Sequence, residues 1–202
     1  MACRSVIAGI GAATLIVATA TSASASGPIL ADHPVLAASL ARISLRSATW
    51  RSALDAVENT RRRVVIVTPD LVRMRDAGDG QESPFDPDVI AEVQPLPDDW
   101  SRVNTVVVVI NLPLLDKLYS DATAADFEAD LDRILAHEVY GHAIPYLLAG
   151  HLSGKCADPL PGQRATESCA IKRENVIRNE LRLGQRREYG VDGLAVTRRY
   201  RQ

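Results

Sequence analysis

The sequence predicts an α+β fold in which a short sheet packs against two helices that carry histidine and glutamate side chains. Residues 63–68 and 104–110 are rich in β-branched residues, which is typical of strands. The row of four valines in the second segment indicates a strand buried on both faces. Residues 123–145 and 164–184 carry apolar side chains at helical spacing, so each is expected to form a helix.

Two local signals refine the helical part of this prediction. Residues 34–58 have an amphipathic pattern that predicts either one helix or two helices separated near residues 47–49. Thr123 and Asp126 form a capping box of the Ser/Thr-x-x-acid kind. The helix that leads towards Pro145 is therefore expected to begin at Thr123.

The composition is that of an ordinary globular protein. The chain has 202 residues, of which 47% are hydrophobic, and a formal net charge of −2. This is enough apolar material for one domain with a buried core, which we place at residues 26–202. A near-neutral chain lacks the basic surface of most nucleic-acid-binding proteins, so no nucleic-acid partner is expected. Nothing in the composition favours one oligomeric state over another.

The first 25 residues have the pattern of a secretory signal peptide. Arg4 provides a positive start, residues 6–20 are apolar, and Ala23, Ser24 and Ala25 fit a cleavage site. The apolar run has about fifteen residues, whereas a membrane-spanning helix needs about 20. We therefore expect a signal peptide at 1–25, a secreted or periplasmic protein, and no stable membrane insertion after cleavage. An uncleaved membrane anchor is the alternative.

Cysteine usage fits an oxidising compartment. Cys3 would leave with the signal peptide, and the remaining chain keeps Cys156 and Cys169. Two cysteines in an exported protein predict one disulfide between them, which would anchor the loop before the second predicted helix. Two free buried thiols are the alternative.

Residues 76–101 differ from the rest of the chain. They contain four prolines and eight acidic residues with no basic one, which predicts a long acidic loop. Such a loop could serve as a lid or as a removable inhibitory segment. Calcium binding is a weaker alternative, because Asp76 to Gly80 do not have the spacing of an EF-hand.

The chemistry of this chain centres on His137-Glu138-Val139-Tyr140-Gly141-His142. In a regular helix, side chains five positions apart diverge by roughly 140° and cannot share one ion. One extra residue accommodated as a π-type bulge would return both histidines to one face, and such bulges occur mainly at functional sites. Gly141 is the expected place for this distortion.

The segment from His137 to His142 resembles the five-spaced zinc motif of the dipeptidyl-peptidase III family. Residues 166–170, Thr-Glu-Ser-Cys-Ala, partly resemble that family's second motif. The chain also looks like the compact zinc peptidase domains of bacterial effectors and toxins. The resemblance implies a small zincin-like domain with one Zn²⁺ held by His137, His142 and Glu167. It further implies that Glu138 activates a water molecule.

The second predicted helix points to the same site independently. Glu167 and Glu174 fall on a stripe that is otherwise mostly apolar, and a buried carboxylate needs a cation or a hydrogen-bond partner. We interpret Glu167 as the third metal ligand and Glu174 as an acid that supports a ligand. Glu174 is the alternative third ligand. Ion pairs of these acids with Arg164, Arg173 or Arg178 would explain the stripe without a metal.

These residues predict a secreted zinc peptidase that acts on a peptide or protein substrate. Three protein ligands leave a fourth position for water, and Glu138 would act as the general base. The donor to the developing oxyanion is open among four residues: Tyr140, Tyr146, His151 and Tyr189. Either valine-rich strand could bind substrate by strand addition.

Two other functions fit the same residues. The protein could be a non-catalytic secreted binding module whose metal is structural or absent. A structural metal would need a fourth protein ligand such as His151 or Glu174. Alternatively, it could be a zinc amidase that cleaves an amide of the cell wall.

Overall fold

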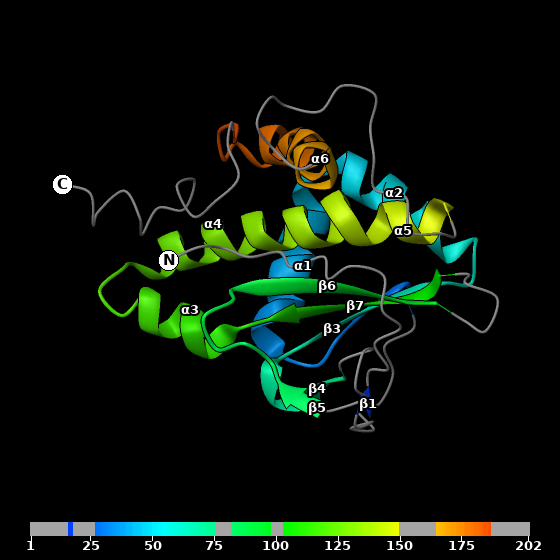
Figure 1. The fold of residues 1–202 in the computed structure, drawn as a ribbon. Helices are drawn as coiled ribbons and strands as arrows, with labels where there is room; N and C mark the ends of the chain where they lie inside the picture. Colours follow the sequence, from blue (N-terminus) through cyan, green and yellow to red (C-terminus); the bar gives the residue numbers. More distant parts are fainter. Residues whose placement is uncertain (1–15, 18–26, 76–81, 98–102, 150–164, 187–202) are drawn as a thin grey trace.

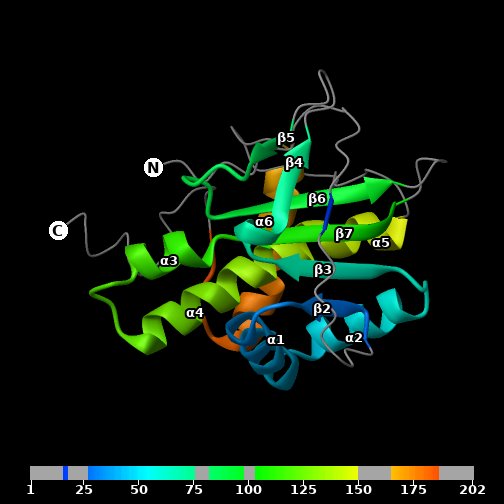
Figure 2. The same ribbon diagram turned by 90° about the horizontal axis from the view of Figure 1, so that it is seen from below.

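The fold is α+β, as the sequence predicts, and its centre is a four-stranded mixed sheet. The structure is a computed structural model, and it describes residues 16–17, 27–75, 82–97, 103–149 and 165–186. The strand order is β2, β3, β7, β6, seen side by side in Figure 2. These strands span Ile29–Ala31, Arg63–Val67, Val103–Ile110 and Ala91–Pro97, respectively. The first three are parallel, and β6 runs antiparallel to β7.

The two predicted strands form the middle of this sheet. Strand β7 is flanked by β3 and β6, and all four of its consecutive valines are fully buried. Val106 and Val108 belong to the large core on the helical side of the sheet, whereas Val107 and Val109 pack with Phe85 on the other side. The valine row therefore reflects burial on both faces. Because β3 and β7 are interior strands, the prediction that either could pair with a substrate is wrong, and the edges are β2 and β6.

The prediction of one continuous loop at residues 76–101 is also wrong. Strands β5 (Glu82–Pro84) and β6 (Ala91–Pro97) lie inside it, and β6 pairs with β7 along its length. Pro95 and Pro97 suggested a loop because proline cannot donate to a ladder, but an edge strand tolerates proline. The register shift at Leu96 and Pro97 marks where regular pairing ends. A lid, an inhibitory segment and calcium binding remain predictions for this region.

A second, smaller sheet lies on the far side from the helices (Figure 1). It consists of β1 (Ile16–Val17), β4 (Val72–Arg75) and β5, and a short 3-10 turn, η1 (Pro69–Leu71), leads into β4. Strand β1 falls within the predicted signal peptide. Cleavage there would remove β1 and leave β4 paired with β5.

The N-terminal helical segment divides in two, as the sequence allows. Helices α1 (Pro34–Arg46) and α2 (Ala48–Glu58) meet at Ser47, which caps both. Its amide donates to Ile43 O at 2.8 Å, and its hydroxyl accepts from Trp50 N at 2.9 Å. A single serine therefore ends one helix and begins the next.

Besides the strands and the turn of the small sheet, two short elements were not predicted. Strand β2 lies just after the expected cleavage site, and helix α3 (Leu112–Leu118) occupies a stretch expected to be a loop. The signal for α3 was Asn111, whose side chain accepts from Leu114 N, followed by an apolar run that contains Pro113.

The predicted capping box is present. Thr123 caps α4 (Ala124–Leu135), and its hydroxyl accepts from Asp126 N at 3.1 Å. The helix then continues as the π-helix η2 (Ala136–Ala143) and as α5 (Ile144–Ala149), so it passes beyond Pro145. Helix α6 (Ala165–Leu181) ends three residues before Gly184.

The elements form successive layers (Figure 1). The continuous helix α4–η2–α5 covers one face of the main sheet, and η2 contacts β6 and β7. Helix α6 lies on the opposite side of η2 and packs mainly on η2, α1 and α2. The expectation that both functional helices pack directly on the sheet therefore holds only for η2. Among the described helices, none has the length and apolar character required to cross a bilayer.

Candidate metal centre

The helix changes its hydrogen-bond register at the histidine motif. Residues Ala136–Ala143 form a π-helix, in which Ile144 donates to the carbonyl of Val139, five residues earlier. This distortion confirms the π-type bulge predicted from the spacing. It brings the His137 and His142 rings together, with centroids 4.9 Å apart and planes at 83°. The two imidazoles therefore share one side of the helix despite being five positions apart.

Gly141 allows helix α6 to approach this turn closely. A Cβ atom at Gly141 would lie 3.0 Å from Ala170 Cβ and 3.1 Å from Ala170 O. Any larger residue would push the two helices apart. The glycine therefore matters here for helix packing as well as for the bulge.

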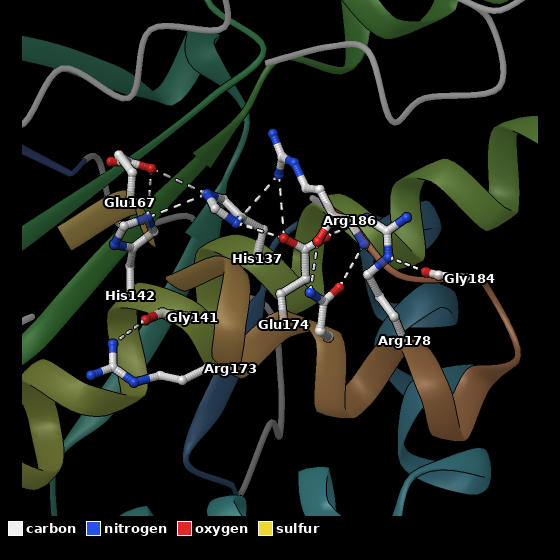
Figure 3. Close-up of polar contacts among 10 residues, drawn as sticks. His137, Gly141, His142, Glu167, Arg173, Glu174, Arg178, Gly184 and Arg186 are labelled. Carbon is white, nitrogen blue, oxygen red and sulfur yellow. Dashed lines mark hydrogen bonds and ion pairs between the residues drawn. The ribbon is translucent and has the colours of Figure 1, made fainter. Parts of the chain in front are cut away.

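Three side chains converge between η2 and α6 (Figure 3). The Nε2 atoms of His137 and His142 are 3.3 Å apart, and Glu167 Oε2 lies 3.5 Å and 3.3 Å from them, respectively. Each of the three residues is only 3% exposed. This buried group could hold a metal ion.

The size of this triangle fits a tetrahedral ion. Three ligand atoms bound to zinc at about 2.0–2.2 Å would lie roughly 3.3–3.6 Å from one another. The measured separations of 3.3–3.5 Å fall in that interval. In addition, neither oxygen of Glu167 has a hydrogen-bond partner among the described residues, although both are buried. A cation at the centre of the triangle would satisfy Glu167 Oε2.

The electrostatics show a site that is rich in negative charge. Burial acts to lower the pKa of His137, but the neighbouring Glu138, Glu167 and Glu174 outweigh it and raise the pKa to about 9. Burial acts to raise the pKa of Glu167, but His137 and His142 lower it to about 2. Without a metal, a proton on the imidazole pair would balance these carboxylates, and a divalent cation can take its place.

Glu174 lies behind His137, outside the triangle. Its Oε2 is 2.9 Å from His137 Nδ1, the ring nitrogen that faces away from the triangle. Its Oε1 accepts from Arg178 Nη1 at 2.6 Å, and Oε2 is 3.3 Å from Arg186 Nη1. Although burial would raise the pKa of Glu174, His137 and both arginines lower it to about 2. As a carboxylate, Glu174 accepts a hydrogen bond from Nδ1–H of His137 and leaves the lone pair of Nε2 free to bind a cation.

The arginines divide between two tasks. Arg178 forms an ion pair with Glu174, as predicted by the alternative in which arginines neutralise the buried glutamates. Arg173 instead donates to the carbonyl of Gly141 at 2.9 Å. Arg164 lies outside the described residues. Arg186 was not predicted, because it follows the end of α6. It is held by Asn175, with backbone contacts of 2.7 Å and 2.8 Å.

Glu138 has one buried oxygen that is not engaged by the described residues. The residue is 2% exposed, and its Oε2 has no hydrogen-bond partner in the described part of the chain. Burial raises the pKa of Glu138, partly opposed by His137 and His142. A buried carboxylate oxygen next to an ion site is suited to accept a proton from a water molecule.

The structure describes two of the four candidate oxyanion donors, Tyr140 and Tyr146. Burial raises the pKa of Tyr146, as do the nearby carboxylates of Glu167 and Glu138, so this residue lies beside the site. Burial also raises the pKa of Tyr140, but its acidic neighbour is Glu180. His151 and Tyr189 lie outside the described residues.

Cys169 is buried on α6 and forms a disulfide. Its predicted partner, Cys156, lies outside the described residues. The bond constrains the helix two residues after Glu167.

The chain matches no protein-family model, no curated protein sequence and no solved structure at the significance expected of a relative.

Proposed function

We propose that the protein is a secreted zinc-dependent peptidase in which His137, His142 and Glu167 bind the metal and Glu138 is the general base. The observation that carries this proposal is the buried triangle of two imidazole nitrogens and one carboxylate oxygen with sides of 3.3–3.5 Å. Two histidines and one carboxylate with a free fourth position form a typical catalytic zinc site.

The donor set favours zinc over other divalent ions. Calcium and magnesium prefer six or more oxygen ligands, whereas this site offers two nitrogens and one oxygen at short spacing. Nitrogen and carboxylate donors around a small tetrahedral space suit zinc.

The surrounding residues support hydrolysis. Zinc in this site would lower the pKa of a water molecule to about 7 and polarise a carbonyl group. Glu138 would accept the proton of that water and deliver it to the leaving amine. Glu174 would hold the His137 ring in one tautomer, and Tyr146 would donate a hydrogen bond to the developing oxyanion.

Strand β6 is the proposed site of substrate binding. It is an edge strand of the main sheet, and it contacts the metal-bearing helix η2. An extended peptide paired with its free edge would run beside the site. This supports a peptide or protein substrate over a small molecule.

Secretion is part of the proposal. The predicted signal peptide at 1–25 and the disulfide at Cys169 both favour a compartment outside the cytoplasm.

A non-catalytic metal-binding module is the second candidate function. The observation that favours it is burial, because the three ligand residues and Glu138 are each at most 3% exposed. Glu174 does not supply the fourth ligand that a structural site needs, since it is engaged by His137 and two arginines. A cell-wall amidase would use the same catalytic residues.

The decisive experiment compares the purified protein with a Glu138→Gln variant. We expect one zinc ion per chain in both, and loss of peptide hydrolysis by at least about 100-fold in the variant. Peptidoglycan digested in parallel with protein substrates separates an amidase from a peptidase. Stoichiometric zinc without any hydrolysis in the unmodified protein would leave the binding module, and equal activity in both proteins would falsify the role of Glu138.

A further inference from the structure

The turn that separates the two histidines is followed immediately by a proline. In an α-helix the carbonyl of Gly141 would accept a hydrogen bond from the amide of residue 145, but Pro145 has no amide hydrogen. In a π-helix, Pro145 would instead be the donor to the carbonyl of Tyr140, and it lacks the amide hydrogen for that bond too. The π-helix η2 ends at Ala143, just before this proline. Pro145 therefore removes the α-helical backbone donor to Gly141 O at the place where the helix must return from π to α geometry.

Arg173 supplies a donor at this position. Its Nη1 lies 2.9 Å from Gly141 O, and Figure 3 shows the side chain reaching from α6 to η2. A charged donor forms a stronger bond to a carbonyl than a neutral amide does. The half-buried position of Arg173 protects this bond from water.

The bond lies where the two ligand-bearing helices are closest. Gly141 faces Ala170 so tightly that a Cβ atom would be 3.0 Å from Ala170 Cβ. Arg173 follows Ala170 by about one helical turn, and Glu167 precedes it by the same interval. One contact therefore joins the neighbour of His142 on η2 to the helix that carries the third ligand.

We infer that Arg173 is a positioning residue for the metal site, which holds the Gly141 carbonyl freed by Pro145 and thereby keeps His142 in register with His137 and Glu167. This inference rests on the proposed metal site. Arg173 does not contact the ligand atoms, and it acts through the backbone of Gly141. It explains why the five-residue spacing occurs together with a proline three positions after His142.

The test measures zinc affinity by competition with a chromogenic chelator, together with the visible absorption of the Co²⁺-substituted protein. Arg173→Met keeps an unbranched side chain about as long as the aliphatic stem of arginine but removes its donors. We expect it to weaken zinc binding by about 10–100-fold and to change the Co²⁺ spectrum, as for other groups that orient a ligand. Arg173→Lys, which keeps one charged donor group, should retain part of the affinity. Lys172→Met is the matched control, because it removes one positive charge from an exposed position on the same turn and should leave both measurements unchanged.

A second pair of variants links the effect to the carbonyl itself. Pro145→Ala introduces an amide that can donate to Gly141 O, so the loss caused by Arg173→Met should be smaller in that background. If Arg173→Met alone does not fold, the same logic predicts that adding Pro145→Ala restores folding and zinc binding.

The outcomes separate this inference from the proposed function. Absence of zinc in the unmodified protein would end both. Zinc binding that is equal in the unmodified protein and in Arg173→Met, or an equal effect of Arg173→Met with and without Pro145→Ala, would overturn the role of Arg173 alone. Failure of Pro145→Ala to rescue an unfolded Arg173→Met protein would overturn it as well.

Discussion

Two groups of buried acids, one on α4 and the other on η2 and α6, differ in how they are satisfied. Asp130 and Asp132 on α4 are buried and engaged by other side chains. Glu138 on η2 and Glu167 on α6 are just as buried, yet Oε2 of the first and both oxygens of the second lack hydrogen-bond partners among the described residues.

The paired acids hold the fold together. Asp130 accepts from the Tyr119 hydroxyl and from Arg133. Asp132 accepts from the Ser39 hydroxyl and from Arg42 Nη2, the latter at 2.9 Å, and so joins α4 to α1. Buried polar groups in folded proteins are normally satisfied in this way. The contrast supports the proposed function, in which a cation would satisfy Glu167 and Glu138 would accept a proton, since folding alone does not favour unsatisfied buried acids.

Among the changes that test this comparison, removal of the metal should have the largest effect on the stability of the folded protein. Zinc in 1,000-fold excess over its dissociation constant stabilises the folded state by about 4 kcal/mol. For a domain of this size that corresponds to a fall in Tm of roughly 8–16 °C on chelation. Differential scanning calorimetry with and without a chelator checks it, and an unchanged Tm would mean that the triangle holds no cation.

Loss of the Glu167 carboxylate, the oxygen ligand of the triangle, should have the second largest effect. Glu167→Ala removes a ligand, so we expect zinc affinity to fall by more than about 100-fold, beyond the effect of changing a supporting residue. Chelator competition measures the affinity. The exposed neighbour Lys172→Ala on the same helix serves as the control. Retention of tight binding would show that another residue supplies the third ligand.

The acid behind His137 should have a smaller effect. Glu174→Gln keeps the size of the side chain but removes the charge that accepts from His137 Nδ1 and pairs with Arg178. We expect zinc affinity to fall by about 10–100-fold. An affinity equal to that of the unmodified protein would make Glu174 a purely structural acid like Asp132.

The paired acids should show the reverse pattern. Asp132→Asn weakens the contacts with Ser39 and Arg42 and should lower the free energy of unfolding by about 1–3 kcal/mol. Zinc affinity should stay unchanged, because Asp132 lies more than one turn before His137. Urea unfolding and zinc titration test the two halves of this prediction. A large loss of affinity would mean that the two groups of acids are coupled.

Features that depend on residues close together in the chain were predictable from the sequence, whereas features that depend on distant residues were not. The capping signals at Ser47 and Thr123 and the strand at 104–110 were predictable, because each depends on residues close together in the chain. The π-helix was predictable from the spacing of His137 and His142, since no regular helix brings them together. The proline-containing strand β6 was not, because only an edge position makes proline acceptable.

The sequence by itself determined which residues could act as metal ligands and where the predicted helices begin. It also determined why the helical turn between His137 and His142 must be distorted. These features follow from side-chain chemistry and local geometry. Only the tertiary structure decided that Glu167 meets the histidines while Glu174 lies behind one of them. It also decided that Arg173 reaches Gly141 and that Arg186 reaches Glu174. These contacts join residues from 12 to 37 positions apart. The packing of α6 on η2 brings the first three within bonding distance, and the return of the chain after α6 brings Arg186 to Glu174.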